Sequence, residues 1–258
     1  MTDRTDIPAA FVERIMADRP EDGPDLLSSM ETSGLTSIRL HPLKPAPIDR
    51  SDPVAWCTDG FYLSERPRFS QDPFWHAGSY YVQEASSMFL HIAFTAMMLP
   101  KDPLVLDACA APGGRSTHLL SLLGGNGLLC SNEIIPKRNN ILRENLTRWG
   151  YANAVATQDS LDRFRPFRST FDVVLADAPC SGEGLFRREA AARRDWSPAH
   201  VSSCALRQSK LLDELVPLIR PGGYLIYSTC TFAYSENEDQ VKQLIQSHGF
   251  EEVSLEGL

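Results

Sequence analysis

The chain has 258 residues, of which 43% are hydrophobic and 22% are charged. This mixture is typical of a globular protein, and the length suits one large or two small domains. The 16 glycines and 18 prolines are scattered without a period, which excludes disordered and collagen-like classes. The formal net charge of −8 argues against a nucleic-acid partner, because contact with phosphates normally shows as a basic excess.

The sequence predicts neither a signal peptide nor a membrane segment. Residues 1–6 are charged, whereas a signal peptide begins with a short basic region and a long apolar stretch. The most apolar window, residues 89–99, is interrupted by His91 and Thr95 and is too short to cross a membrane. We therefore expect a cytoplasmic protein that makes no membrane contact, and we expect it to be a monomer.

The cysteines predict neither a metal site nor disulfides. No two of them have the Cys-x-x-Cys spacing of a zinc site, and without a secretion signal disulfides are not expected. Taken singly, each is best interpreted as a small buried apolar residue. The six are Cys57, Cys109, Cys130, Cys180, Cys204 and Cys230.

Residues 1–100 predict a small α+β domain. An amphipathic helix is expected over residues 7–16, and short extended segments are expected at residues 37–40 and 61–63. The prolines between these two segments forbid a continuous element. A helix over residues 83–99 then leads into the second domain.

Residues 101–258 alternate between apolar strands and helical periods, which is typical of a doubly wound, Rossmann-like, mainly parallel α/β sheet. Five strands are expected first, at residues 104–106, 127–132, 154–157, 171–176 and 224–228, and a sixth at residues 250–255. One helix is expected after the first strand and its glycine-rich turn, and it ends at Leu123. Three further helices are expected over residues 136–149, 206–219 and 236–248.

The first strand is followed by a run of small residues that favours a nucleoside ligand. Open α/β sheets bind ligands beyond the carboxyl ends of their strands. Here Asp107 precedes a turn that lacks the G-x-G-x-x-G pattern of dinucleotide sites. Small side chains allow a ligand close to the backbone, and the following helix offers free N–H groups. The residues of this predicted cofactor site are Cys109, Ala110, Ala111, Pro112, Gly113, Gly114 and Arg115.

Two more acids follow the next two strands. Glu133 ends the second strand and is placed to accept hydrogen bonds from ribose hydroxyls. Asp159 follows the third strand, where it can reach an adenine amino group. Because the sequence has no pyrophosphate loop, S-adenosylmethionine fits this site better than NAD.

Two cysteines follow the fourth and fifth strands. These strands are neighbours in a doubly wound sheet, about 4.8 Å apart, so we expect Cys180, Cys230 and Asp177 around one pocket beside the methyl donor. A thiolate that adds to carbon-6 of a pyrimidine turns the ring into an enamine, whose carbon-5 can take a methyl group. Asp177 would hydrogen-bond the ring, and the second thiol would help to remove the carbon-5 proton. This chemistry does not decide which cysteine attacks.

These motifs resemble those of the Nol/Nop/Sun family of RNA cytosine-5 methyltransferases. The similarity is carried by DAPCSG at residues 177–182, STCT at 228–231, CAAPGG at 109–114, YYVQEASS at 80–87 and ENE at 236–238. The region around residues 37–40 and 56–57 resembles the bacterial branch that methylates small-subunit ribosomal RNA.

The resemblance implies an S-adenosylmethionine-dependent enzyme that acts on RNA, ribosomal rather than transfer RNA. It implies that Cys230 is the nucleophile and that Cys180 serves product release. It places the donor on residues 109–115, Glu133, Asp159 and Asp177. One departure is Arg115-Ser116, where the family usually has Lys-Thr; both pairs keep a cation and a hydroxyl, although Arg and Lys are not interchangeable.

The resemblance also implies a seventh, antiparallel strand and a downstream RNA-binding domain, for which no residues remain before Leu258. We therefore expect a truncated chain with an exposed strand edge. Alternative interpretations are a donor- or RNA-binding fragment without turnover, a tRNA enzyme, and a methyltransferase for DNA or a small molecule. The paired cysteines argue against a small molecule, and a DNA enzyme would attack from Cys180.

The charge is distributed unevenly, which weakens the argument from the net charge. Residues 137–194 carry 11 basic and 7 acidic side chains, a local charge of +4. Four arginines follow the DAPCSG motif closely, where an RNA backbone could meet them: Arg187, Arg188, Arg193 and Arg194.

Overall fold

The computed structural model describes residues 6–32 and 34–255. Within them the chain forms two compact units. Unit 1 combines the described parts of 1–34 with 178–213 and 227–252, and unit 2 combines 35–177 with 214–226 and the described part of 253–258. Each unit therefore contains segments that are distant in the sequence.

Unit 2 contains a five-stranded sheet with the order β6-β5-β4-β7-β8. The printed pairings of β4 with β5 and β7, and of β5 with β6, are parallel. Asp107 pairs in register with Ser131 on one side and Leu175 on the other, so these strands end at one edge. The expected doubly wound α/β class is confirmed. The strands are β4 (Leu104–Asp107), β5 (Leu128–Asn132), β6 (Ala154–Thr157), β7 (Phe171–Asp177) and β8 (Ile219–Ser228).

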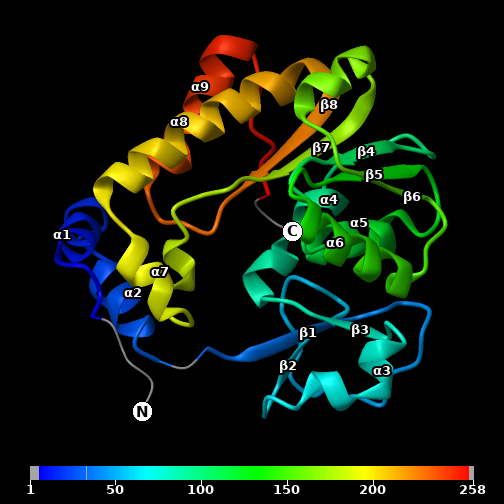
Figure 1. The fold of residues 1–258 in the computed structure, drawn as a ribbon, viewed down its shortest axis with the longest axis horizontal. Coiled ribbons are helices and arrows are strands. Elements are labelled where there is room, and N and C mark those ends of the chain that lie inside the picture. The colour runs from blue at the N-terminus through cyan, green and yellow to red at the C-terminus, as the bar shows by residue number, and fades with distance from the viewer. Residues whose placement is uncertain (1–5, 33, 256–258) are drawn as a thin grey trace. The chain divides into compact units, whose positions relative to one another are not determined.

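Three helices of unit 2 lie on one side of this sheet: α4 (Leu90–Thr95), α5 (Gly114–Leu123) and α6 (Pro136–Trp149) (Figure 1). Local signals set the bounds of α6, because Pro136 lies in its first turn and Gly150, at φ 91°, ends it. Leu119, Leu120 and Leu142 pack with the buried strand residues in one apolar core.

A second, three-stranded sheet in unit 2 has the order β2-β1-β3, and β1 is antiparallel to both neighbours. Its strands are β1 (Thr36–Leu40), β2 (Gly60–Leu63) and β3 (Tyr80–Val82). The extended segments expected at residues 37–40 and 61–63 are β1 and β2. Short helical segments complete the unit: η1 (Phe69–Gln71), α3 (Pro73–His76), η2 (Ala85–Phe89), η3 (Leu161–Phe167) and η5 (Val216–Leu218).

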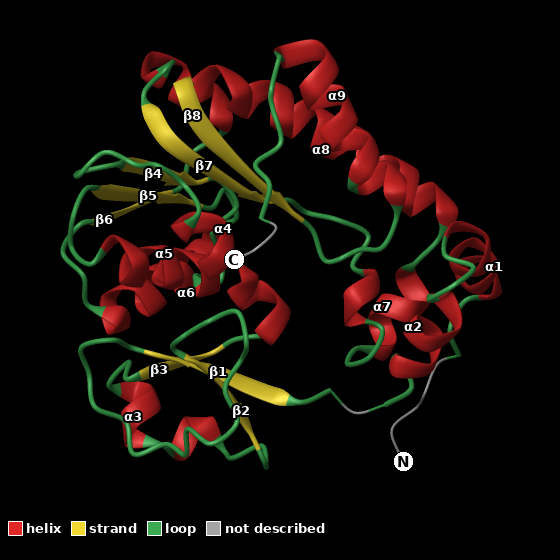
Figure 2. Cartoon of the chain, turned by 180° about the vertical axis from the view of Figure 1, so that it is seen from behind, coloured by secondary structure: helices red, strands yellow, loops and turns green. Residues whose placement is uncertain are grey.

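Unit 1 consists of helices joined by loops, apart from the last two residues of β8 (Figure 2). Its core is aromatic: the Phe11 ring meets the rings of Phe186 and Trp196 edge-on, with centroids 4.9 and 5.6 Å apart. The helices are α1 (Ala9–Asp18), α2 (Gly23–Ser29), η4 (Glu183–Leu185), α7 (Ala190–Asp195), most of α8 (Pro198–Leu215), η6 (Tyr234–Glu236) and α9 (Glu238–His248).

Three predicted elements differ in the structure. The helix expected over residues 83–99 is instead a 3-10 segment followed by α4, which ends at Thr95, because the i,i+3 spacing of Ala85 and Met88 buries both side chains. Helix α8 begins at Pro198 rather than residue 206, because Pro suits a first helical turn and the Ser197 hydroxyl accepts a hydrogen bond from the His200 amide. Strand β8 begins at Ile219 rather than residue 224, and it includes Pro221, Gly222 and Gly223.

The strand predicted at residues 250–255 is wrong. These residues belong to neither sheet of the described structure. Gly249, at φ 69°, ends α9, and residues 250–255 pair with neither edge strand of the five-stranded sheet, β6 or β8. Within residues 6–32 and 34–255, no helix combines the length and apolar character that a membrane crossing requires.

Candidate active site

An open cleft of about 510 Å³ lies at the carboxyl end of β4 in unit 2. The structure brings most of the predicted cofactor residues to its wall: Cys109, Ala110, Ala111, Pro112, Gly114, Arg115 and Asp177, together with Asp107. Their assignment to a donor remains a prediction.

Asp107 gives the cleft a buried acceptor that a ligand can use. Its side chain is fully buried, and Oδ2 accepts a 2.6 Å hydrogen bond from the Ser116 hydroxyl. Within the described residues, Oδ1 has no partner in hydrogen-bond geometry. Burial raises the pKa of Asp107 to about 6, although Ser116 and Arg115 oppose the rise. A ligand with an N–H, O–H or cationic group would therefore fit this position, as S-adenosylmethionine would.

The small residues of the loop are required by close backbone approaches. Gly113 has φ 109°, and a Cβ atom there would lie 3.2 Å from Leu142 and 3.3 Å from Asn145. Asn145 donates to the Pro112 carbonyl at 2.7 Å, and Arg138 donates to the Ala111 carbonyl at 2.8 Å. Helix α6 therefore holds the loop from outside, and the opposite side of the loop remains available to a ligand.

Arg115 forms an ion pair with Asp177, so the residue that departs from the family pattern connects α5 to the end of β7. Both side chains are partly exposed at the cleft. Cys109 also lines the cleft, where burial raises the pKa of its thiol to about 12. It is consequently a neutral thiol near pH 7 and a poor nucleophile.

Glu133 and Asp159 do not line this cleft. The carboxylate of Glu133 is buried and accepts a 2.9 Å hydrogen bond from the Ile135 amide, with Arg138 at 3.4 Å. Asp159 is exposed and borders a separate apolar cleft of about 790 Å³ beneath η3. Gly113 is likewise absent from the lining, because it faces α6. The contacts of Glu133 with ribose and of Asp159 with adenine therefore stay predictions.

The segment before β4 contributes residues to the cleft for which sequence reasoning found no role. Tyr81, Gln83, Glu84 and Ser87 lie in its wall. Gln83 is held by Arg39, whose Nε donates to Oε1 at 2.8 Å. Because these residues precede the first strand of the large sheet, only their presence in the YYVQEASS motif could have indicated them.

The two predicted catalytic cysteines lie together in unit 1. Their sulfur atoms are 3.2 Å apart, and the Cys230 amide donates to the Cys180 sulfur at 3.3 Å. Cys230 is exposed, whereas Cys180 is half-buried. The hydrogen bond with Cys230 and, next, burial raise the pKa of Cys180. The high pKa makes Cys180 the thiol donor of the pair and favours Cys230 as the thiolate. The predicted position of Asp177 around the same pocket as these thiols stays a prediction.

Glu236 joins the two cysteine loops, although sequence reasoning assigned it no role beyond membership of the ENE motif. Its fully buried carboxylate accepts hydrogen bonds from the Ser181 amide and from Gln208 Nε2, both at 2.9 Å. The Ser181 hydroxyl contacts Glu236 and also Thr231, at 2.8 Å. Since Ser181 follows Cys180 and Thr231 follows Cys230, this network fixes the spacing of the thiols.

Glu183 and Gly184 support the loop of Cys230 from the other side. Glu183 is fully buried and accepts hydrogen bonds from Trp196, from Arg14 and from the Phe232 amide. The Gly184 amide donates to the Cys230 carbonyl at 2.8 Å, and a Cβ atom on Gly184 would lie 3.0 Å from that oxygen. Larger side chains at residue 184 would push the loop away.

One of the four arginines predicted to meet RNA is structural. Arg193 is buried, donates to the Phe186 and Met30 carbonyls and pairs with Glu31 at 3.2 Å. It is therefore not available to a nucleic acid, and the prediction is wrong for this residue. Arg187, Arg188 and Arg194 are exposed.

Comparison with known families agrees with this geometry. The family described as "16S rRNA methyltransferase RsmB/F" matches residues 95–256, more than half of the chain. The chain belongs to the RsmB/F family. The N-terminal domain of 16S rRNA methyltransferase RsmF also matches, over residues 7–85, and the resemblance to the bacterial small-subunit branch is thereby confirmed.

Curated relatives of this RsmB/F chain are named Ribosomal RNA small subunit methyltransferase F. The protein of Serratia proteamaculans is 33% identical over 98% of this chain and 56% of its own length. That of Aeromonas hydrophila is 35% identical over 96% of the chain and 56% of its own length. The chain thus spans about half the length of the curated relatives it matches.

Solved structures share the fold of this family member. A methyltransferase homologue from Pyrococcus horikoshii aligns with a TM-score of 0.78 and 27% identity over 92% of this chain and 78% of that one. NSun6 from Pyrococcus horikoshii, solved with SFG, aligns with a TM-score of 0.80 over 93% of this chain and 87% of that one. At 18% identity, this second likeness shows the fold alone.

Proposed function

We propose that this chain carries out S-adenosylmethionine-dependent methylation of carbon-5 of a cytosine in RNA, with small-subunit ribosomal RNA as the substrate. The observation that carries the proposal is the pair of thiols 3.2 Å apart on the loops after β7 and β8. A pair of thiols suits a reaction that forms and then breaks a covalent bond to the base. The names of the curated relatives support the choice of ribosomal RNA.

The cofactor cleft supports the same proposal. S-adenosylmethionine supplies a methyl group that is activated by a sulfonium charge. Residues 109–115 would hold it against the backbone, with Asp107 and Asp177 at the wall of the cleft, and Glu133 and Asp159 would reach its ribose and adenine. SFG, with which the NSun6 structure was solved, is an analogue of this donor.

The two cysteines would divide the covalent steps. The Cys230 thiolate would bond to carbon-6 of the cytosine, and carbon-5 would then take the methyl group, whose bond to the donor sulfur breaks to leave a neutral thioether. A base would remove the carbon-5 proton, and the electron pair of that bond would expel the Cys230 thiolate and restore the aromatic ring. Cys180, which lies beside that sulfur, assists this release, and Asp177 would hydrogen-bond N3 and the exocyclic amine. The exposure of Cys230 and the raised pKa of Cys180 support this division of roles.

A tritiated methyl-transfer assay tests the proposal. The chain and labelled S-adenosylmethionine are incubated in three separate reactions, which contain small-subunit ribosomal RNA, tRNA or duplex DNA. We expect label at carbon-5 of cytosine in the ribosomal RNA. Calorimetry that finds donor binding with no transfer to any substrate would identify a binding fragment, and label in tRNA or DNA alone would reject ribosomal RNA as the substrate.

A further inference from the structure

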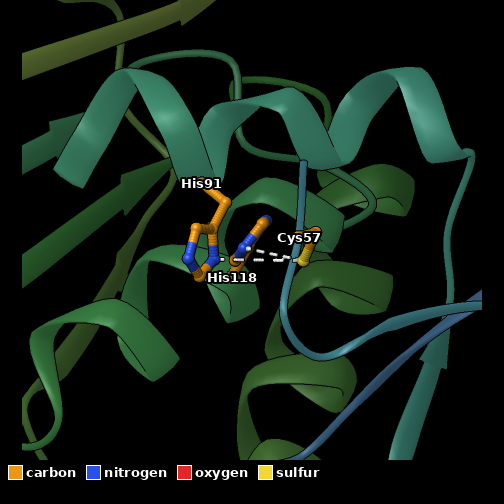
Figure 3. A group of neighbouring side chains, drawn as sticks. All are labelled: Cys57, His91 and His118. Carbon is orange, nitrogen blue, oxygen red and sulfur yellow. Dashed lines mark hydrogen bonds between the residues drawn. The ribbon is translucent and has the colours of Figure 1, made fainter. Parts of the chain in front are cut away.

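A second group of reactive side chains lies in unit 2, apart from the residues that line the cofactor cleft. Cys57, His91 and His118 come from three segments: the loop before β2, helix α4 and helix α5 (Figure 3). The possible ligand atoms of the three residues all lie within 4.8 Å of one another. The proposed methylation chemistry uses none of them.

The three side chains converge on one point. The Cys57 sulfur is 3.9 Å from His91 Nδ1 and 3.9 Å from His118 Nε2, and both rings face the sulfur (Figure 3). A tetrahedral zinc ion with Zn–S of about 2.3 Å and Zn–N of about 2.0–2.1 Å places sulfur and nitrogen about 3.6 Å apart. The two sulfur–nitrogen distances therefore need a contraction of only a few tenths of an ångström, while the two ring nitrogens, within 4.8 Å of each other, would have to approach to about 3.4 Å.

The polar atoms of this cluster are poorly satisfied by one another. Cys57 and His118 are 2% and 1% exposed. Both imidazoles share one sulfur at long distances of 3.9 Å. Buried polar groups normally form better hydrogen bonds than these. A metal ion would replace two long contacts with three short bonds.

Two charged groups act on the cluster. The charge of Asp59 favours a cation here, whereas that of Arg39 opposes it.

We propose that Cys57, His91 and His118 bind a single Zn²⁺ ion. One thiolate and two imidazoles form a donor set that zinc binds commonly. The ion would join the loop before β2 to α5, the helix that follows the cofactor loop, so its role is structural support of that cleft. The absence of Cys-x-x-Cys spacing does not exclude such a site, because its ligands come from separate segments.

Metal content and cobalt spectroscopy test this site without any measurement of activity. The chain is stripped with a chelator and titrated with Co²⁺, and Zn²⁺ is then added as competitor. We expect one equivalent of Co²⁺ to give tetrahedral visible bands and a thiolate-to-cobalt charge-transfer band, both removed by Zn²⁺. Absence of these bands in the folded wild-type chain would overturn the proposal and leave a core cluster only.

Variants assign the bands to particular ligands. Cys57→Ser should abolish the charge-transfer band, and His118→Gln should weaken binding by more than about 100-fold, since loss of a mere supporting group costs about 10- to 100-fold. If Cys57→Ser does not fold, the half-buried His91→Gln serves instead, and it should keep the charge-transfer band but lose affinity.

Two controls exclude the other thiols. Cys204→Ser removes a buried thiol outside the cluster and should bind Co²⁺ as the wild type does. The double change Cys180→Ser and Cys230→Ser should do the same. Bands that persist in Cys57→Ser but vanish in the double variant would place the metal on the other pair of cysteines and refute the site.

Discussion

The sulfur atoms of Cys180 and Cys230 lie 3.2 Å apart, and the Cys230 amide donates to the Cys180 sulfur. Two thiols in this arrangement cannot be equivalent, because one donates a proton toward the other. The hydrogen bond between the two sulfur atoms and, next, burial raise the pKa of Cys180, so its proton is retained while Cys230, the exposed member, supplies the thiolate.

Replacement of each of the two cysteines should therefore have a different effect on methyl transfer and on the covalent adduct. Cys230→Ala should lower methyl transfer by at least about 1,000-fold, since the nucleophile is lost, and should form no covalent adduct with RNA. Cys180→Ala should accumulate the adduct, which denaturing gels with labelled RNA detect. Cys204→Ala, at a buried thiol outside the pair, should behave as the wild type. Equal behaviour of the Cys180 and Cys230 variants would contradict the assigned roles.

Glu236 should act as a positioning residue for both thiols. In Glu236→Gln, an amide N–H₂ replaces one carboxylate oxygen and faces the donors of Ser181 or Gln208. Hydrogen bonds to charged groups contribute about 1.5–3 kcal/mol each, so we expect the free energy of unfolding to fall by about 3 kcal/mol in urea titrations. Methyl transfer should fall while calorimetric affinity for S-adenosylmethionine stays unchanged.

The matched control for this change is Glu238→Gln, two residues further along and exposed. It should alter neither stability nor transfer. If the two variants are indistinguishable, Glu236 does not hold the cysteine loops.

Asp107 should make donor binding sensitive to pH. Its pKa of about 6 means that the carboxylate is charged at pH 7.5 and largely protonated at pH 5. Loss of that charge removes an acceptor from the cleft, so calorimetry should show weaker binding of S-adenosylmethionine at pH 5. Asp107→Asn should bind about 10- to 100-fold more weakly at pH 7.5, the equivalent of one charged hydrogen bond, with little further loss at pH 5. Asp102→Asn, at an exposed acid, should retain the wild-type pH dependence.

Much of the large sheet could be predicted from the sequence because its signals are local. Residues 136–149 and 154–157 form α6 and β6 with the predicted bounds. Pro136 marks the first turn of the helix and Gly150 marks its end. The apolar segments predicted as strands are too short to form helices. The neighbouring positions of β7 and β8 follow from the class of sheet, and they predict that Cys180 and Cys230 lie close together.

What the sequence could not predict depends on contacts between distant segments. Strand β3 has only three residues and exists because it pairs with β1. In the sequence, Glu236 resembles any acidic residue near the start of a helix. Its role depends on its hydrogen bonds with Ser181 and Gln208, which come from distant segments. The cluster of Cys57, His91 and His118 has no characteristic spacing, because each residue lies on a different segment.

His41 should make the stability of unit 2 depend on pH. The Leu43 amide donates to Nδ1 at 3.0 Å, so the ring is neutral and Nε2 donates to the Trp149 carbonyl at 3.1 Å. Burial and, next, the charge of Lys44 lower the pKa of His41 to about 4. Between pH 6.5 and 4 the unfolded chain binds a proton that the folded chain does not, so stability is lost as the pH falls.

Urea titrations should show that the wild type loses on the order of 1 kcal/mol more than His41→Gln between pH 7 and 5, after allowance for partial solvent screening. His76→Gln, at an exposed ring, should follow the wild type, and an equal loss in His41→Gln would show that this ring does not carry the effect.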